Sequence, residues 1–549
     1  MQSLLPFNRT SWRRSCRHAK QCPKDAHRLR AQVFRCVASV QQVPVGATRA
    51  SPSAVGRPGE ELPADSWYTK NIAIPRHVDS VKVAMLEGKG RGLVATRDIA
   101  LGELVMATPP LVLVTSPQRQ RPSGELVVDE ILERRLYSSK WFSVLYDGSS
   151  RSCKSQLELA PDADAAAPAA AAAEAEASGS SPAAASASSS EAADAPRSAR
   201  PPEPILASTS APSPAAATAA PAEKKKGFLA SRGPAMRRGK GSAAAGAAGD
   251  LGAAAAQLPL PDRREQTRLA KVVKFNCFGD DAEDLAACEC RGEQPRGHIG
   301  LWPEFALFNH SCAPNTINYV VGEAMVVRAS RHIKAGEEVT ICYLGRPQLL
   351  PVSRRISILA EDYGFECSCA RCTAEQAHYD KVEDVYMELF EAVTEQLGPA
   401  FLEARAAADE EGVREVQRQV QAWLRRLYGL FRKTLLAPDV RQYVLASLYD
   451  AYDLLLSCAD ALGQGEDASS LQASLKAIEA VSAGSDLHVL LAIRHFDETV
   501  RQHGPDSPLA ELARQALRRA HVARYGPVSE GMMARLVDLN RKLHVESSS

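Results

Sequence analysis

The sequence lacks three features that would assign it to a familiar class of protein. Its 549 residues carry a formal net charge of only +1, so the overall charge gives no reason to expect a nucleic-acid partner. No apolar run approaches the roughly 18 residues that a membrane-spanning helix needs, so we expect no membrane partner. The 13 cysteines are not spread in pairs, as those of a disulfide framework would be. At this length the chain can hold two or three domains.

Aromatic residues are almost absent between residues 158 and 261, where Ala, Ser and Pro dominate. Such a segment cannot bury enough apolar surface to offset the entropy lost on ordering, so we predict a disordered insertion. It carries two basic clusters, Lys224 to Lys226 and Arg237 to Lys240. Without interleaved aromatics, these clusters favour a solvated linker over a nucleic-acid-binding surface.

Residues 1–60 are nearly free of acid, with Asp25 the only acidic residue before Glu60. A basic, Ser-bearing segment without a continuous apolar stretch is typical of an organelle transit peptide and not of a secretory signal. We therefore expect a chloroplast or mitochondrial location. The alternative is a disordered basic tail, and the protein would then be located in the nucleus or cytoplasm.

The cysteines concentrate in the middle of the chain, where eight of them lie between residues 277 and 372. Three of these, Cys367, Cys369 and Cys372, have C-x-C-x-x-C spacing, and Cys312 precedes them by 55 residues. Four sulfur ligands satisfy a tetrahedral zinc ion, so we predict a zinc site at these four positions. A site filled by four thiolates has no open position for water, which makes this zinc structural.

Three further cysteines leave an alternative open. Cys277, Cys288 and Cys290 could bind a second metal, with His298 as a fourth ligand. Because the spacing is poor for that geometry, we favour free thiols in a loop.

Alternation and helical spacing predict the elements around these motifs. Short strands joined by glycine turns are expected between residues 81 and 106, and helices at 129–146 and 262–276. A short helix between Tyr343 and Tyr363 carries Arg354, Arg355 and Ile358. We expect these side chains to pack and solvate that helix, and not to bind substrate. From residue 374 onward, apolar residues at three- and four-residue spacing predict an all-α region of six or seven helices separated by Pro and Gly, without a clear 34-residue repeat.

Four motifs occur in a fixed order along the chain. They are GKGRGLVATRDIALGE at 88–103, FNHSCAPN at 308–315, GEEVTICY at 336–343 and CSCARC at 367–372. This ordered set resembles the SET-domain protein-lysine methyltransferases, in particular the split-SET group that includes the SET-and-MYND and tetratricopeptide-SET proteins. The resemblance covers roughly residues 66–146 and 262–373. The insertion lacks the dense Cys/His set of a MYND finger, so we expect none there.

The resemblance implies an α+β fold. It consists of a β-rich SET domain with a pseudoknot, a zinc-bound post-SET segment and an all-α C-terminal domain. We therefore divide the chain as follows: 1–60, transit peptide or basic tail; 66–157, first half of the SET domain; 158–261, disordered insertion; 262–347, second half of the SET domain; 348–373, post-SET zinc segment; 374–549, helical domain.

The resemblance also implies an activity, the S-adenosylmethionine-dependent N-methylation of lysine in a histone or another protein. Retention of the tyrosine, Asn-His and cysteine motifs together favours an active enzyme. The alternative is an inactive SET-like scaffold that binds protein partners through its helical domain. A nucleic acid would be a partner only indirectly, through chromatin.

The family pattern further implies which residues form the site. Tyr343 is the expected catalytic residue, with its hydroxyl directed at the transferring methyl group, and Phe365 would stack on adenine and wall the lysine channel. Glu337 and Glu338 are interpreted as a turn before a strand, not as a general base. The expected contacts to S-adenosylmethionine are Lys89, Gly90, Arg91, Asn276, Ala306, Leu307, Phe308, Asn309, His310, Tyr343 and Phe365.

Overall fold

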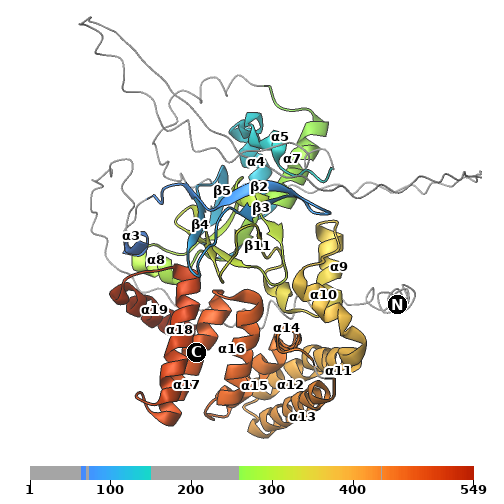
Figure 1. Ribbon diagram of the computed structural model, residues 1–549, viewed down its shortest axis with the longest axis vertical. Helices are drawn as coiled ribbons and strands as arrows, with labels where there is room; N and C mark the ends of the chain where they lie inside the picture. The colour runs from blue at the N-terminus through green and yellow to red at the C-terminus, as the bar shows by residue number, and fades with distance from the viewer. Residues whose placement is uncertain (1–63, 70–72, 150–258, 435, 549) are drawn as a thin grey trace, which may run out of the picture. The chain divides into compact units, whose positions relative to one another are not determined.

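Three small sheets form the first part of the fold in the computed structural model, which describes residues 64–69, 73–149, 259–434 and 436–548 (Figure 1). The first sheet has the order β1-β4-β10-β9: His77–Val78, Leu104–Thr108, Ala324–Ala329 and Thr316–Val321. The second has the order β2-β3-β11-β8: Val81–Leu86, Gly90–Ala95, Glu338–Ile341 and Asn309–His310. The third has the order β5-β7-β6: Val112–Ser116, Gly297–Leu301 and Phe278–Asp280.

The second sheet determines where the candidate site lies. Its strand β3 pairs with both β2 and β11 in antiparallel fashion, so residues from the two halves of the chain share one sheet. At its edge, β8 pairs with β11 in parallel, with Thr340 opposite Asn309 and Ile341 opposite His310. The strands predicted between residues 81 and 106 are therefore confirmed, and the NHSC motif lies beside the strand that leads to Tyr343.

A helical cluster packs on the third sheet. α4 (Gly124–Glu133), α5 (Trp141–Val144) and α7 (Arg263–Asn276) share one apolar core with β5 and β7. The predicted helix at 262–276 is confirmed as α7, whose Asp262 cap accepts a hydrogen bond from the Glu265 amide. The single helix predicted at 129–146 is wrong. The chain breaks after α4 because Arg135 has a φ of 58°, and the 3-10 turn η2 (Leu136–Ser138) precedes α5.

Short helices lie between the later strands of the SET region and after its last strand, where the chain leads into the helical C-terminal region. They are α8 (Leu285–Arg291), η4 (Phe305–Leu307), η5 (Arg346–Leu349), α9 (Val352–Asp362) and α10 (Ala370–Ala377). Cys288 and Cys290 lie on α8 and not in the expected loop, because Asp284 caps a helix there by accepting the Ala287 amide. The predicted boundary at residues 373 and 374 falls inside α10.

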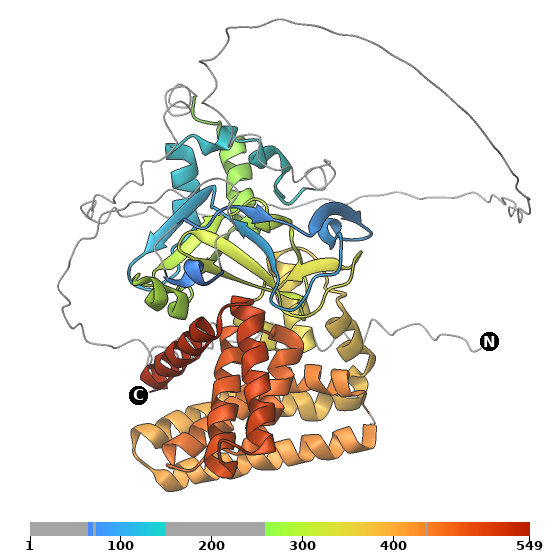
Figure 2. The ribbon, with the colours of Figure 1, turned by 60° about the vertical axis from the view of Figure 1, so that its left-hand side comes forward.

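Nine α-helices follow in the described part of the C-terminal region, more than the six or seven predicted (Figure 2). They are α11 (Tyr379–Glu391), α12 (Gly398–Ala406), α13 (Glu410–Thr434), α14 (Pro438–Ala446), α15 (Tyr449–Ala461), α16 (Ala468–Ser482), α17 (Asp486–His503), α18 (Pro508–Tyr525) and α19 (Glu530–Ser548), with a π-helical segment η6 (Ala392–Leu397) before α12. The prediction failed because two breaks use neither Gly nor Pro. The chain turns at Ala408, with a φ of 52°, and again at Ser447 and Leu448.

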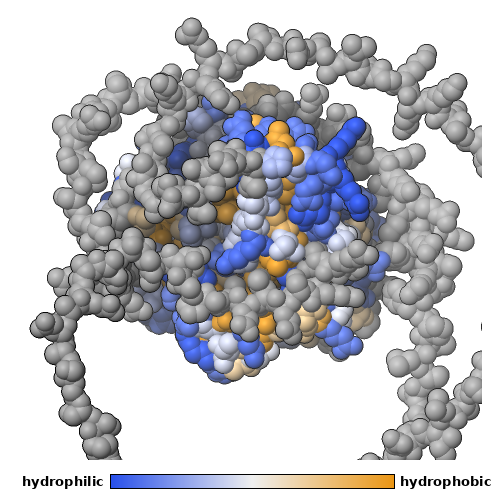
Figure 3. Space-filling model, turned by 90° about the horizontal axis from the view of Figure 1, so that it is seen from above, coloured by the Kyte–Doolittle hydropathy of each residue, from blue (hydrophilic) through white to orange (hydrophobic). Residues whose placement is uncertain are grey.

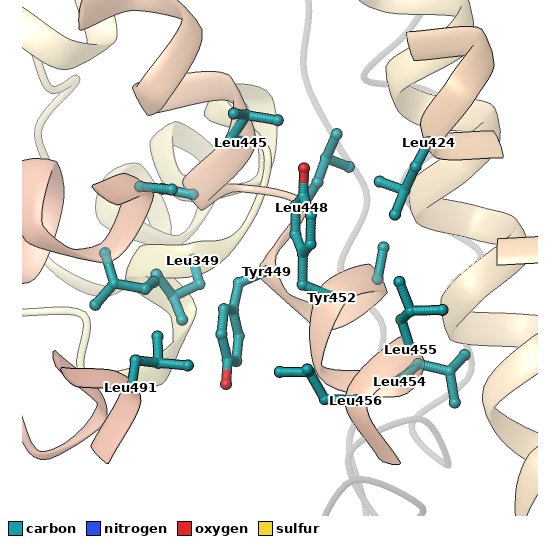
Figure 4. Close-up of a cluster of buried hydrophobic side chains, with 14 of the residues drawn as sticks. Leu349, Leu424, Leu445, Leu448, Tyr449, Tyr452, Leu454, Leu455, Leu456 and Leu491 are labelled. Atoms are coloured by element: carbon teal, nitrogen blue, oxygen red, sulfur yellow. The ribbon is translucent and has the colours of Figure 1, made fainter. Parts of the chain in front are cut away.

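The apolar stripes of these helices form one core. The buried residues of α13 include Val420, Leu424 and Phe431, at the spacing expected from the sequence. Figure 4 shows Leu424 facing the side chains of α15, with Leu349 of η5 in the same cluster. The segment that follows the SET region therefore contributes to the core of the helical region.

A second contact between the two regions is buried and polar. Arg524 of α18 lies 2.7 Å from the carboxylate of Asp284, and both side chains are almost fully buried. The Tyr319 hydroxyl on β9 donates to the Arg524 carbonyl at 2.6 Å. At Gly102, which has a φ of 78°, a side chain would meet the Val522 carbonyl at 2.4 Å. Only glycine fits here, because α18 closely approaches the turn that precedes strand β4.

The first described helix, α3 (Ala64–Thr69), also packs at this contact between the two regions. We call the contact around Arg524, Asp284 and Tyr319 the seam. Asp65 accepts the Ser529 amide at 2.9 Å, and Arg291 donates to the Trp67 carbonyl at 2.8 Å. The buried Tyr68 hydroxyl contacts that of Tyr319 at 3.0 Å. Segments from both ends of the described chain therefore meet at α8.

The surface of the described part is mixed in character. Figure 3 shows a face on which hydrophilic side chains surround smaller apolar areas. No helix of the described residues is both long enough and apolar enough to cross a membrane.

The buried ion pair at the seam predicts a large effect of one substitution. Arg524→Met should lower the free energy of unfolding by about 3–5 kcal/mol, because the buried Asp284 carboxylate loses its cation. Arg541→Met, which removes the half-exposed pair with Asp497, is the control and should cost less than about 1 kcal/mol. Urea unfolding of both variants would measure this, and equal small losses would contradict a structural role for the seam.

Candidate active site and metal centre

The GKGRG motif forms the turn of the β2–β3 hairpin. Gly88 and Gly90 have φ values of 70° and 77°, which side-chain-bearing residues rarely adopt. Between them, Lys89 extends its ammonium to within 2.5 Å of a Glu338 carboxylate oxygen on β11. The turn is thus attached to the second half of the SET domain.

Glu338 also holds Asn309. The Asn309 amide donates to the other carboxylate oxygen of Glu338 at 2.9 Å. A methyl group added at Gly92 would lie 2.5 Å from the Asn309 amide nitrogen, so the β3 backbone closes one side of this pair. From the sequence, Glu338 was expected only to form a turn. Its role depends on strand register, which the residue pattern alone does not give.

Arg91 and Asn276 lie at the join between the two halves of the domain. The buried Arg91 guanidinium donates to the Val144 carbonyl. The Asn276 amide, at the end of α7, donates to the Tyr146 and Val272 carbonyls at 2.7 Å each. Both residues, which were expected to contact S-adenosylmethionine, therefore bind backbone carbonyl groups of α5, α7 and the segment after α5.

His310 connects Tyr343 to the cysteine cluster. Its Nδ1 accepts the Tyr343 amide at 3.0 Å, so the ring proton is on Nε2. Nε2 faces the Cys312 sulfur at 3.2 Å. Burial raises the pKa of the Tyr343 hydroxyl above its ordinary value near 10, and this hydroxyl donates to the Phe308 carbonyl at 2.5 Å.

The segment from Ala306 to Phe308, just before Asn309, offers mainly its backbone to the candidate site. Leu307 and Phe308 have side chains in the core of the SET domain, and Ala306 packs on the helical cluster beside the third sheet. With the Leu307 and Phe308 side chains buried, the main chain of these two residues is what a ligand could contact.

Aromatic rings surround Tyr343. Its ring centroid is 5.2 Å from that of His310 and 5.2 Å from that of Tyr363. Phe365 is 6.1 Å from His310 and remains 37% exposed, so its face is accessible. Tyr363, whose hydroxyl donates to the Tyr343 carbonyl, was not among the predicted site residues. Its position two residues before Phe365 was the available signal.

The four predicted metal ligands come together. The sulfur atoms of Cys312, Cys367, Cys369 and Cys372 lie within 4.8 Å of one another, and the Cys312 and Cys372 sulfurs are 3.6 Å apart. Tetrahedral Zn–S bonds of about 2.3 Å require sulfur separations of about 3.8 Å, so the cluster fits a zinc ion. Hydrogen bonds from the other three thiols lower the pKa of Cys312 well below its ordinary value.

The remaining central cysteines do not form such a cluster. In the part of the chain that the structure describes, no other group of three or more His, Cys, Asp or Glu side chains has this geometry. Burial raises the pKa of Cys277 to about 12, which disfavours the thiolate that a metal needs. Free thiols at Cys277, Cys288 and Cys290 agree better with this arrangement.

The sulfur geometry predicts that one substitution removes the metal. Cys369→Ser should reduce bound zinc from about one ion per chain to near zero, because three thiolates bind zinc far more weakly than four. Cys458→Ser changes a buried thiol of α15 outside the cluster and should leave the zinc content unchanged. Elemental analysis of the purified variants gives the answer, and full zinc in Cys369→Ser would exclude this ligand set.

Comparison with known proteins agrees with the geometry. Residues 90–344 match the model of the SET domain family. Histone-lysine N-methyltransferase SMYD3 of Mus musculus is 37% identical over 107 residues, 19% of this chain and 24% of that protein. N-lysine methyltransferase SMYD2 of Homo sapiens is 35% identical over 128 residues, 23% and 27% of the two chains, and the potential protein lysine methyltransferase SET6 of Saccharomyces cerevisiae is 39% identical over 89 residues, 16% and 24%.

These matches are partial, since the chain spans about a quarter of the length of the curated relatives it matches. The family model itself covers residues 90–344, which hold the NHSC and GEEVTICY motifs and strands β3, β8 and β11 of the sheet shared by the two halves of the chain. On these grounds residues 90–344 form a SET domain, which is similar to those of the SMYD lysine methyltransferases.

Proposed function

We propose that this protein is an S-adenosylmethionine-dependent protein-lysine N-methyltransferase. The observation that carries the proposal is the position of Tyr343 between His310, Tyr363 and the Phe308 carbonyl, beside a hairpin turn attached through Glu338. The names of the related proteins, which describe lysine methyltransferases, support the same reaction class.

The polar groups around the hairpin turn suit the methyl donor. Lys89, Asn309 and Glu338 place an ammonium, an amide and a carboxylate within one hydrogen-bonded chain. The donor's amino-acid portion carries an ammonium and a carboxylate, so these side chains offer partners of both signs. Gly88 and Gly90 keep the turn open to a ligand, and a side chain at Gly88 would meet nothing within 4 Å.

When bound, S-adenosylmethionine supplies a methyl group on a positively charged sulfur. The substrate lysine must present a neutral amine, whose nitrogen forms the new C–N bond as the S–CH₃ bond breaks, and the methylated amine then loses a proton. The rings of Tyr343, Tyr363 and Phe365 would line the approach of the lysine, and closing them over the bound substrate would exclude water, disfavour the charged ammonium and fix the direction of attack.

Tyr343 would act on the methyl group through its oxygen. Because its hydroxyl hydrogen is donated to the Phe308 carbonyl, the oxygen lone pairs remain for weak CH···O contacts. Methyl hydrogens next to a sulfonium carry partial positive charge, and a fixed oxygen stabilises them without reorganising. Burial keeps the hydroxyl protonated and therefore in this orientation.

The proposal also includes the kind of protein that is methylated and the compartment in which it lies. A histone or another protein would supply the lysine, with nucleic acid involved only through chromatin. The basic segment at residues 1–60 lies outside the described residues and favours a chloroplast or mitochondrial substrate.

Removal of one oxygen atom tests the proposal. Tyr343→Phe should lower the rate of labelled methyl transfer into a whole-cell protein extract by about a hundredfold, because the methyl group loses its fixed oxygen partner. Tyr428→Phe, which breaks a hydroxyl pair with Tyr452 in the helical region, is the matched control and should retain activity. If zinc-loaded wild type binds no donor and transfers no label, the scaffold function replaces the enzyme.

The rate should also depend on pH in one direction. A lysine amine with a pKa near 10.4 is deprotonated about tenfold more with each pH unit between 7 and 9, so kcat/KM should rise by up to about tenfold per unit. Burial raises the pKa of Tyr343, so that group does not titrate in this range. A flat profile from pH 7 to 9 under conditions limited by chemistry would show that amine deprotonation is not required in this step.

A further inference from the structure

Two arginines and one glutamate are fully enclosed beside the cysteine cluster. Arg355 of α9 and Arg371 of α10 both contact Glu375, at 2.9 and 2.8 Å, and the side chains are at most 3% exposed. Arg355 was expected to pack and solvate its helix, and the solvation is wrong, because the side chain is fully buried. One carboxylate neutralises only one of the two guanidinium groups, so a positive charge is left over in the interior.

The surplus charge lies next to sulfur. An Arg355 guanidinium nitrogen is 3.7 Å from the Cys372 sulfur. Arg371 donates to the carbonyls of Cys312 and Gln348, both at 3.0 Å, and so holds the backbone of one expected metal ligand. Both arginines are therefore directed at the segment that carries the ligands.

The same arginines reach into the helical C-terminal region. The Ser447 hydroxyl, at the end of α14, accepts from Arg371 at 2.7 Å and from Arg355 at 3.1 Å. Ser447 is buried and follows the last turn of its helix, where it donates to the Tyr443 carbonyl. One hydroxyl of the helical region thus fixes both cations.

Charge balance explains why two cations are buried here. A zinc ion with four thiolates carries a charge of −2, and an uncompensated charge of that size is costly in a protein interior. A buried Arg–Glu–Arg cluster alone is often no more stable than apolar residues of the same volume. Beside an anionic metal centre, the extra guanidinium offsets the thiolate charge and donates hydrogen bonds toward it.

We propose that Arg355 and Arg371 are positioning and charge-balancing residues of the four-cysteine metal centre, and that Ser447 links metal affinity to the docking of the helical C-terminal region. Because such coupling is reciprocal, metal release should loosen the attachment of α14, and loss of the Ser447 contact should weaken metal binding. This inference depends on the cysteine site and does not require methyl transfer.

Competition for zinc tests the proposal on the full-length protein. Zinc-loaded wild type and variants would be titrated with a chromophoric chelator at pH 7.4. Arg371→Met and Arg355→Met should bind zinc at least about tenfold more weakly, since partners of metal ligands typically change affinity by 10- to 100-fold. Ser447→Ala keeps all charges and should weaken binding by about two- to fivefold.

Arg346→Met is the matched control. Arg346 also joins the two regions, through Asp450 at 2.9 Å and the Tyr449 ring, but the contacts described for it include no cysteine sulfur. Its zinc affinity should equal that of wild type. Wild-type affinity in a folded Arg371→Met variant, judged by circular dichroism, would overturn the proposal.

A milder pair keeps the test decisive if the methionine variants do not fold. Arg371→Lys retains the charge but not the planar guanidinium group, and Ser447→Ala retains all charges. Each of these single variants should weaken zinc binding, while its helical content stays unchanged. Wild-type affinity in both variants would overturn the proposal. Methyl transfer, measured separately, would show whether a variant with normal zinc has lost only catalysis.

Discussion

The parallel pairing of a two-residue strand with the end of β11 determines the site. It places Asn309 and His310 beside the strand that leads to Tyr343. His310 then uses its two ring nitrogens on opposite sides, toward the Tyr343 amide and the Cys312 sulfur. If this pairing were lost, Asn309, Tyr343 and the cysteine cluster would separate, because each is attached to the others through these few backbone positions.

Motif order predicted which segments meet, and the spacing of the cysteines predicted the metal cluster. The sequence could not show which polar groups pair across the sheet, because register is set by tertiary contacts. For that reason Glu338 was interpreted only as a turn residue. The burial of Arg355 on α9 was missed because it depends on packing against Glu375 and Ser447, which lie far along the chain. The helix breaks at Ala408 and Ser447 were missed, since neither residue is a typical helix breaker and packing imposes the turn.

Polar contacts, more than apolar ones, define how the helical region is attached. Arg524 with Asp284 at one end, and Arg371 with Ser447 at the other, are buried pairs that tolerate little displacement. Hydrogen bonds and ion pairs of this kind specify a single orientation, whereas an apolar interface can slide. The two regions therefore hold a fixed orientation relative to each other.

Helix α3 limits how the N-terminus can be processed. Asp65, Trp67 and Tyr68 contact residues from α8, β9 and the segment before α19, so this helix is an integral part of the seam. A protease that removes a leader would have to cut before Ala64 to leave these contacts intact. A cut inside α3 would expose the buried Tyr319 and Tyr525, and a chain shortened in that way would be less stable and more readily degraded.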